Sequence, residues 1–383
     1  MHIRSPEGPV MARSRRLRIG AAVFSLAALA ASSLMTNRFL TADAATDQKR
    51  PGHVLAAVAV AEYHLGDKAF TDEPDWPGYS EMRAVVHYPR RFPREKMPLI
   101  VLLHGQNSPC YVPDHGPSGW PCPPGVKPYP SFRGYDYLGK ALAQDGFVVV
   151  SLSANGINHF MGVATQRAKL IAEHLGLWQR LTSSGTGPLA GKLIDAVTGR
   201  PAGADFRGRV DMTRVGLMGH SVGGQAVMFA AGDDRRGEVP AGVRIRGVVT
   251  LASAGGRSPD DESRVTRTSF AVVSSECWRE GDREFFDNAR GRTRLPTFLV
   301  RVARANHNFF NTAWTTGPGS VDGDDTGCPG TPDRPTAAQQ QDFAVAYLTA
   351  YYRLALKDDR SGMPVLTGAR GVPGVDTTVD RLP

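Results

Sequence analysis

The sequence predicts an α/β protein built on a mostly parallel sheet. Short apolar runs typical of buried strands alternate with segments of helical periodicity along most of the chain. Such alternation is characteristic of right-handed strand–helix–strand units, whose parallel strands are covered by helices on both faces. The candidate reactive residues come directly after predicted strands, which is where sheets of this kind bind ligands.

The first 44 residues have the composition of an export signal. A basic segment that contains the pair Arg15-Arg16 precedes an apolar stretch at 19–34, and an A-x-A-like cleavage site ends at Ala44. The arginine pair resembles the twin-arginine signals that export folded proteins. The apolar stretch is shorter than the roughly 20 residues that a membrane span needs. We therefore expect a cleaved signal at 1–44 and a secreted or extracytoplasmic protein, with an uncleaved anchor as the alternative.

The charge of the chain does not indicate a nucleic-acid partner. The formal net charge is +8, but residues 1–44 contain six arginines against one glutamate and one aspartate, so half of the excess belongs to the signal. The rest of the chain has no long Lys/Arg run and no nucleic-acid-binding motif. We therefore expect no nucleic acid among its partners.

The four cysteines agree with export, because disulfides form in oxidising compartments. They are Cys110, Cys122, Cys277 and Cys328, and they allow three pairings. A Cys110–Cys122 bond would close a Pro/Gly-rich loop, and a Cys277–Cys328 bond would join the loops of the candidate acid and base. Four free thiols are the alternative. None of the spacings suits a zinc site, and we expect no metal and no cofactor.

The expected elements begin near residue 83. Strands are predicted at 83–88, 99–103, 147–152, 215–218, 248–251, 270–273 and 297–302, and helices at 135–145, 165–179, 225–231 and 337–356. These elements place a catalytic domain at 81–356, after a linker and N-terminal extension at 45–80 and before a turn-rich tail at 357–383. The glycine-rich segment at 183–209 is compatible with a lid or an insertion.

The segment Gly219-His220-Ser221-Val222-Gly223 joins an apolar strand to a helix of small residues. A serine hydroxyl is a poor nucleophile unless it is exposed beside a base. A tight strand-to-helix turn provides the exposure, and glycines permit the turn because side chains there would clash with neighbouring segments. Ser221 is therefore the predicted nucleophile. The pattern is common, so a glycine-rich turn without a catalytic role is the alternative.

A second motif, His104-Gly105-Gln106, ends the apolar strand at 99–103. In such hydrolytic sites the loop after this strand donates one backbone N–H to the oxyanion, and the residue after the nucleophile donates another. The predicted donors are Gln106 and Val222, each contributing about 3 kcal/mol in the tetrahedral state. We interpret His104 as a buried structural histidine and not as the base.

His307 is the predicted general base. It is the only one of the 10 histidines that follows Ser221 in the sequence, and it comes a few residues after the strand at 297–302. Enzymes whose nucleophile lies on such a turn carry nucleophile, acid and histidine in this chain order. A loop histidine without a role is the alternative.

Several carboxylates compete for the role of the acid that would orient His307. The acid should follow the strand at 270–273 and accept the Nδ1–H of the imidazole. Glu276 is the first candidate in that loop. The alternatives in the same loop or after the preceding strand are Asp282, Glu280, Asp260 and Asp261. Each of these carboxylates could instead be a solvated loop charge.

These motifs resemble the α/β-hydrolase superfamily. The sequence is most similar to secreted bacterial hydrolases related to dienelactone hydrolases, cutinase-like polyester hydrolases and platelet-activating-factor acetylhydrolases. The similar blocks are 102–106 (LLHGQ), 133–138 (RGYDYL), 153–158 (SANGIN), 219–224 (GHSVGG) and 306–311 (NHNFFN). They span about residues 80–355, and the resemblance implies the α/β-hydrolase fold.

The chain departs from these relatives at two positions. The relatives often carry arginine where this chain has Val222, and their acid typically follows a cysteine in a C-D-G-D-like loop. Here Trp278 follows Cys277, so Glu276 would have to act from a shifted position.

The expected activity is hydrolysis of a carboxylic ester in a small molecule, a lipid or a polymer, through a Ser-acid-His triad and an acyl-enzyme. An acyltransferase or a peptidase would use the same nucleophile, although no propeller-like repeat of the oligopeptidase kind is present. A degenerate hydrolase that binds an apolar ligand is a further alternative. We expect no membrane span after signal cleavage, and the sequence makes no prediction of the oligomeric state.

Overall fold

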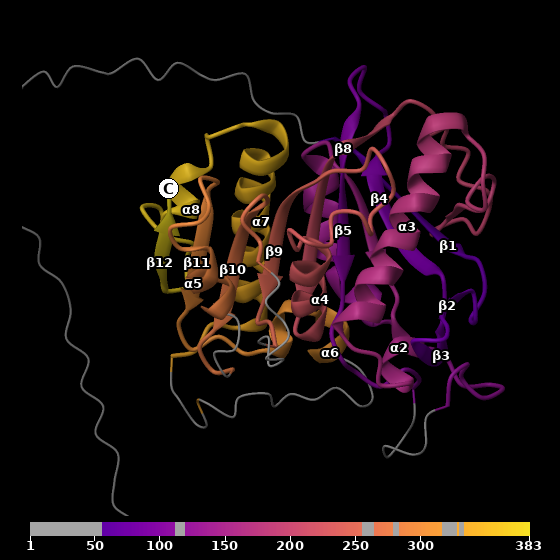
Figure 1. Ribbon diagram of the computed structural model, residues 1–383, viewed down its shortest axis with the longest axis horizontal. Coiled ribbons are helices and arrows are strands. Elements are labelled where there is room, and N and C mark those ends of the chain that lie inside the picture. The colour runs from indigo at the N-terminus through magenta and orange to yellow at the C-terminus, as the bar shows by residue number, and fades with distance from the viewer. Residues whose placement is uncertain (1–55, 112–118, 255–263, 279–282, 316–327, 329–332) are drawn as a thin grey trace, which may run out of the picture. The chain divides into compact units, whose positions relative to one another are not determined.

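The computed structural model describes residues 56–111, 119–254, 264–278, 283–315, 328 and 333–383. These residues form a ten-stranded sheet with helices on both faces (Figure 1). The predicted α/β class is therefore confirmed. The signal predicted at 1–44 lies outside the described residues.

The bounds of the strands and helices are as follows. The strands are β1 (Val58–His64), β2 (Phe70–Asp72), β3 (Trp76–Ser80), β4 (Arg83–Pro89), β5 (Met97–Leu103), β6 (Val148–Leu152), β7 (Ile194–Asp195), β8 (Val210–His220), β9 (Ile245–Leu251), β10 (Ser269–Ser275), β11 (Thr297–Val302) and β12 (Thr377–Leu382). The helices are η2 (Ser131–Tyr135), α1 (Asp136–Gln144), α2 (Asn155–His159), α3 (Ala164–Ser184), α4 (Val222–Ala230), α5 (Arg283–Ala289), η3 (Asn308–Phe310), α6 (Thr312–Thr315), α7 (Ala337–Lys357) and α8 (Met363–Leu366).

The strand order of the large sheet is β12-β11-β10-β9-β8-β5-β6-β4-β1-β7. Its central strands, from β11 to β6, are parallel to their neighbours, whereas β12, β4, β1 and β7 are antiparallel additions at the two edges. Every residue of β5 and β10 is buried. Continuous burial explains why these strands appear in the sequence as unbroken apolar runs, because a parallel strand is covered on both faces.

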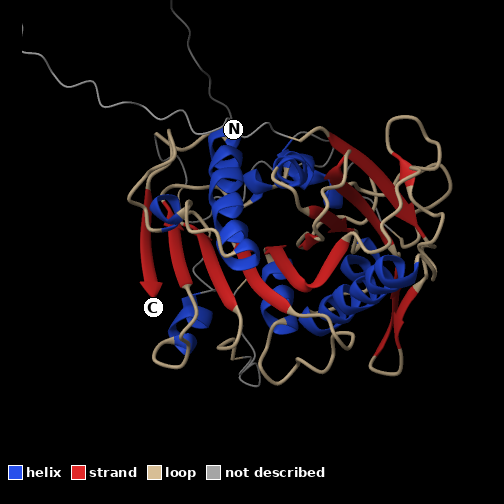
Figure 2. Cartoon of the chain, turned by 90° about the horizontal axis from the view of Figure 1, so that it is seen from above, coloured by secondary structure: helices blue, strands red, loops and turns tan. Residues whose placement is uncertain are grey.

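Helices α3 and α4 pack on one face of the sheet, and α1 and α7 pack on the other (Figure 2). Successive residues of a strand point to opposite faces. Accordingly, Leu99 and Val101 of β5 belong to the apolar core on the α3 and α4 side, whereas Ile100 and Leu102 belong to the core on the α1 and α7 side. The central strands are thereby held rigidly between two apolar layers.

Segments on both sides of the predicted catalytic domain at 81–356 also take part in the sheet. The part of the predicted linker at 45–80 that the structure describes contributes β1 to the large sheet and forms the separate β2–β3 pair. The predicted tail at 357–383 contains α8 and β12, and β12 pairs along the whole of β11. The sequence patterns of β1 and β12 are weak for physical reasons. In β1 only every second residue is buried, and β12 is a polar edge strand, as sheet edges commonly are.

The segment at 183–209 is an insertion on the edge of the sheet away from Ser221. Its short strand β7 pairs with β1, and Phe206 packs against Trp178 of α3 with ring centroids 5.1 Å apart. The Arg209 carbonyl accepts the N–H of Met97 at 2.8 Å, at the amino end of β5. These contacts lie at the β7 side of the sheet and at the amino end of β5. A lid would instead contact the carboxyl ends of the strands, so the segment is an insertion.

Both disulfides expected from the sequence are present, Cys110–Cys122 and Cys277–Cys328. The first closes the loop after β5, and the second joins a residue just after β10 to a residue that precedes α7. Within the described ranges, no helix combines the length and the apolar character needed to cross a membrane.

Four buried histidines predict an acid-sensitive stability. Burial lowers the pKa of His87 to about 4 and the pKa values of His104 and His174 to about 3, and it lowers the pKa of His220 well below its ordinary value. Below a pH of about 6.5, the unfolded chain therefore binds more protons than the folded one. We expect the free energy of unfolding to fall by up to roughly 2 kcal/mol per histidine between about pH 7 and pH 5.

Urea denaturation at a series of pH values measures this dependence. The His174→Gln variant should bind about one proton fewer on unfolding at acid pH, because one of the four groups is gone. A free energy of unfolding that stays constant from about pH 7 to pH 5 would contradict the neutral, buried state of these side chains.

Candidate active site

Ser221 lies on a strained turn between β8 and α4. Its φ is 57° and its ψ is −129°, a conformation that residues other than glycine rarely adopt. The turn is fixed by two backbone hydrogen bonds, from Ser221 N–H to the Leu251 carbonyl at 3.0 Å and from Gly224 N–H to the Ser221 carbonyl at 2.8 Å. Strain of this kind persists only where the surroundings impose it, and it is concentrated at functional sites.

The glycines around Ser221 are required by close backbone contacts. A Cβ on Gly219 would lie 2.0 Å from the Gly223 carbonyl oxygen, and a Cβ on Gly223 would lie 2.6 Å from the Leu103 carbonyl oxygen. A Cβ on Gly105 would lie 2.5 Å from the Ser221 Cβ and 3.1 Å from its Oγ. The loop after β5 therefore runs directly against the candidate nucleophile.

The two predicted oxyanion donors belong to the segments that flank Ser221. Val222 follows Ser221 as the first residue of α4, and Gln106 follows Gly105 in the loop that contacts Ser221. No hydrogen bond between described residues uses either backbone N–H. An oxyanion site needs such donors unoccupied before substrate binds, so Gln106 and Val222 remain its predicted donors.

His104 is a neutral side chain that stabilises the loop after β5 through hydrogen bonds. It is fully buried, and its Nε2 accepts the N–H of Ala154 at 2.9 Å, so the ring hydrogen is on Nδ1 and is donated to the Gly105 carbonyl at 2.8 Å. Burial lowers the pKa of His104 to about 3. These contacts agree with the structural role predicted for His104.

Two further side chains, for which the sequence predicts no role at the site, contact the loop after β5. Asn158 of α2 donates its Nδ2 to the Gly105 and Asn107 carbonyls at 3.3 and 3.1 Å, and Gln106 Nε2 donates to the Asn158 carbonyl at 3.0 Å. Arg167 of α3 donates to Gln106 Oε1 at 3.2 Å and to Asn158 Oδ1. Burial of the guanidinium lowers the pKa of Arg167 to about 10.

A buried carboxylate, Glu81, fixes the helix that carries Asn158. Its oxygens accept the backbone N–H groups of Asn155 and Gly156 at 2.8 and 3.0 Å, and the hydroxyls of two serines, Ser80 and Ser153. Its negative charge also favours the charged form of the buried Arg167. Buried charges are tolerated when they are hydrogen-bonded and compensated, and here they fix the position of the loop beside Ser221.

His307 is brought back to Ser221 by the loop after β11. Two strands, β9 and β10, separate β8 from β11 in the sheet. Even so, His220 Nε2 donates to the His307 carbonyl at 2.9 Å, and the two imidazole rings are 4.9 Å apart. The structure thus places the predicted base against the residue that precedes the predicted nucleophile.

The remaining nitrogen of His220 is also occupied. Because Nε2 donates, Nδ1 is the acceptor, and it receives the hydroxyl of Tyr135 at 2.9 Å. Burial and the neighbouring His307 lower the pKa of His220 well below its ordinary value, so His220 is a neutral connector. In the sequence, His220 is only a variable position of the Gly219–Gly223 motif, and no local pattern indicates its contact with His307.

The imidazole of His307 packs among aromatic rings and has a defined tautomer. Its centroid lies 4.1 Å from that of Trp278, at an interplanar angle of 32°, and 6.2 Å from that of Trp314. Its Nδ1 lies 2.8 Å from Asn308 Oδ1. With Asn308 Oδ1 as the acceptor, Nδ1 carries the hydrogen and Nε2 keeps the lone pair that a general base requires.

Glu276 does not reach His307 in this arrangement. Its side chain is exposed, and its Oε2 accepts the backbone N–H of Arg304 at 2.7 Å, in the turn after β11. No hydrogen bond among the described residues joins Glu276 to His307. The alternative acids lie outside the described residues, namely Glu280, Asp282, Asp260 and Asp261.

No family model matches the chain, and a search of curated proteins found no significant match. Within the described residues, no group of three or more His, Cys, Asp or Glu side chains is placed to hold a metal ion. The function is therefore inferred from the geometry around Ser221.

A double-mutant cycle tests the connection through His220. His220→Phe removes the donor to the His307 carbonyl and the acceptor of the Tyr135 hydroxyl, and we expect it to lower the free energy of unfolding by about 2–4 kcal/mol. Tyr135→Phe removes one bond and should cost about 1–2 kcal/mol. The double variant should cost about 1 kcal/mol less than the two single costs together. Strictly additive costs in urea denaturation would contradict the bond between these side chains.

Proposed function

We propose that the protein is an exported serine hydrolase of the α/β-hydrolase type, which cleaves a carboxylic ester through an acyl-enzyme on Ser221. The observation that carries the proposal is the strained turn of Ser221, whose φ is 57°. The Gly105 loop runs against this turn, and His220, the residue before Ser221, donates a hydrogen bond to the His307 carbonyl. The turn presents the hydroxyl where a strand ends and a helix begins, which is the geometry of a nucleophile on this type of sheet.

Acylation begins with attack of Ser221 Oγ on the ester carbonyl while His307 Nε2 takes the hydroxyl proton. The imidazolium formed in this step packs against the face of Trp278, a contact that contributes about 1 kcal/mol or more to a cation once water is excluded. The oxyanion accepts hydrogen bonds from the N–H groups of Gln106 and Val222, each contributing about 3 kcal/mol to the tetrahedral state.

Breakdown of this state expels the alcohol, which receives the proton held by His307. A water molecule then attacks the acyl-enzyme, His307 takes its proton, and the carboxylic acid leaves as the proton returns to Ser221 Oγ. Acyl transfer would differ only in the acceptor. Product analysis with an added alcohol separates the two reactions, because transfer gives a new ester and hydrolysis gives the acid.

The disulfides and the signal-like sequence at 1–44 support the proposal that the protein is exported. Both cysteine pairs are bonded, and structural disulfides are typical of exported proteins. One of them holds Cys277, and the next residue in the sequence, Trp278, packs against the ring of His307. An oxidising compartment would thus also stabilise the loop that shapes the base.

A fluorophosphonate probe tests the nucleophile directly. We expect a covalent adduct on Ser221, located by mass spectrometry, because the probe reacts only with an activated serine. The adduct should be absent from Ser221→Ala and strongly reduced in His307→Ala. It should persist in Ser253→Ala, a buried serine just after β9. No adduct in folded, disulfide-bonded protein would refute the enzyme and favour ligand binding by a degenerate hydrolase.

The Glu276→Gln variant distinguishes two roles for this carboxylate, which are acceptance of the Arg304 N–H and the role of the triad acid. The Glu276→Gln side chain can still accept the Arg304 N–H through its amide oxygen, but it carries no charge. We therefore expect kcat of the variant with an activated ester to stay within about tenfold of the parent, where tenfold is about 1.4 kcal/mol. Loss of about 10⁴-fold, the effect of neutralising a triad acid, would instead assign that role to Glu276.

A further inference from the structure

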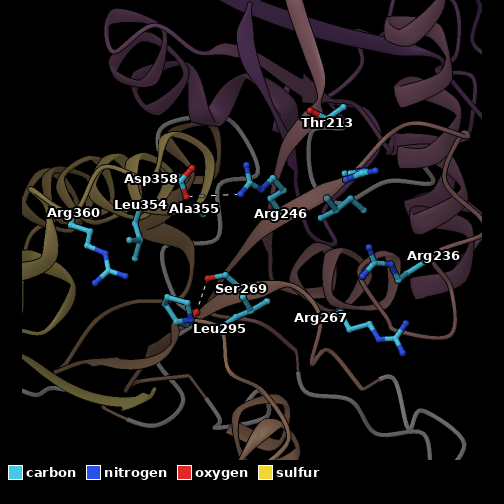
Figure 3. Close-up of a pocket in the computed structure, with 13 residues that line it drawn as sticks. Thr213, Arg236, Arg246, Arg267, Ser269, Leu295, Leu354, Ala355, Asp358 and Arg360 are labelled. Carbon is cyan, nitrogen blue, oxygen red and sulfur yellow. Dashed lines mark hydrogen bonds and ion pairs between the residues drawn. The ribbon is translucent and has the colours of Figure 1, made fainter.

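A basic pocket lies at the amino ends of β8, β9 and β10, beside the last turn of α7. Its volume is about 610 Å³. Five arginines line it, with Asp358 as the one acidic side chain among its lining residues, and Figure 3 shows four of the five labelled around the hollow. The five are Arg236, Arg244, Arg246, Arg267 and Arg360.

The arginines of the pocket are largely without counter-charges. Arg246 approaches Asp358 at 3.9 Å, at an exposed position. The other four side chains make no ion pair within the described part of the chain. By contrast, Arg214 and Arg235, next to lining residues in the sequence, pair with Asp211 at 2.7 Å and Glu238 at 3.0 Å. The excess positive charge is therefore concentrated in the pocket.

The ends of nearby helices offset only part of the positive charge of the pocket. Helices α4 and α7 end at this edge, and a helix C-terminus carries about half a negative charge. Both helix ends, Asp358 and Asp233, whose carboxylate accepts the Arg267 backbone N–H at 3.1 Å, supply about three negative charges against five arginines, which leaves a surplus of about two positive charges. Crowded like charges raise the free energy of the empty pocket, and a bound anion relieves that repulsion.

The pocket is separate from the candidate active site. Ser221 follows the carboxyl end of β8, whereas the pocket lies at the amino ends of the same parallel strands. Seven residues of β9 lie between the two edges, a distance of about 20 Å at roughly 3.3 Å per residue. Occupation of the pocket therefore does not depend on the chemistry proposed for Ser221.

We propose that this pocket binds a soluble anion that carries two or more phosphate groups. Guanidinium groups bind phosphate oxygens through paired, charge-assisted hydrogen bonds, and arginines from separate segments would hold several phosphates at once. The arginines come from the segment after α4, from β9 and the residue that precedes it, from the residues before β10 and from the segment after α7. None of the lining residues is aromatic, which disfavours single-stranded nucleic acid, whose bases stack on aromatic rings.

Calorimetric titration of the mature, disulfide-bonded protein with inorganic tripolyphosphate tests the proposal. We expect one saturable site in about 50 mM NaCl whose affinity falls as salt screens the charges. Orthophosphate should bind at least about tenfold more weakly, because a single phosphate reaches fewer arginines. Ser221→Ala should bind tripolyphosphate as the parent does, which separates this result from the outcome of the fluorophosphonate experiment.

Two variants and a matched control locate the site. Arg244→Gln and Arg267→Gln should each weaken tripolyphosphate binding about tenfold, equivalent to about 1.4 kcal/mol. Arg200→Gln makes the same charge change at an exposed position outside the pocket and should keep the affinity. All three positions are exposed, so the variants should fold, and thermal unfolding checks this.

Three results would overturn the proposal. Equal weakening in the Arg200→Gln control would show attraction to the overall positive charge of the chain. Absence of saturable binding would show that the arginines hold no anion of this class. Binding to phosphatidylglycerol vesicles without binding to tripolyphosphate would assign the arginines to a lipid surface.

Discussion

The hydrogen bond from His220 to the carbonyl of His307 is the contact on which the site depends. It joins the turn after β8 to the loop after β11 across two intervening strands, and it spans only 2.9 Å. Because Tyr135 donates to the other nitrogen, the imidazole of His220 is held as a neutral tautomer that can only donate toward His307. The backbone of the candidate base is thus held by the residue that precedes the candidate nucleophile.

A second set of buried contacts fixes the other side of Ser221. Glu81 holds α2, Asn158 of α2 holds the backbone of the Gly105 loop, and Arg167 joins Asn158 to Gln106. The two charges in this set lie in the interior, where the low dielectric strengthens well-formed hydrogen bonds and makes missing ones costly. Such a scaffold would keep the oxyanion donors in place before substrate arrives, which is how electrostatic preorganisation lowers a barrier.

The sequence was informative where local patterns decide the structure. Fully buried strands such as β5 are continuous apolar runs, and the glycines around Ser221 follow from backbone contacts that can be anticipated from the motif. The sequence was uninformative where the structure depends on contacts between segments that are far apart in the chain. The half-buried β1 and the polar β12 have no strong pattern, and the roles of His220 and Arg167 arise from contacts between distant segments. Glu276 is a similar case, because its distance to Arg304 depends on how two neighbouring loops pack.

The pairing of β12 with β11 links the end of the sheet to the order in which the domain can be assembled. Strand β11 leads into the loop of His307, and one of its edges is completed only by residues 377–382. A growing chain that has produced all of the residues around Ser221 would still expose the backbone groups of β11, which are a template for pairing with other chains. Residues 377–382 therefore complete the hydrogen bonding of β11, the strand that leads into the loop of the candidate base, and they replace its apolar edge with the polar edge strand β12.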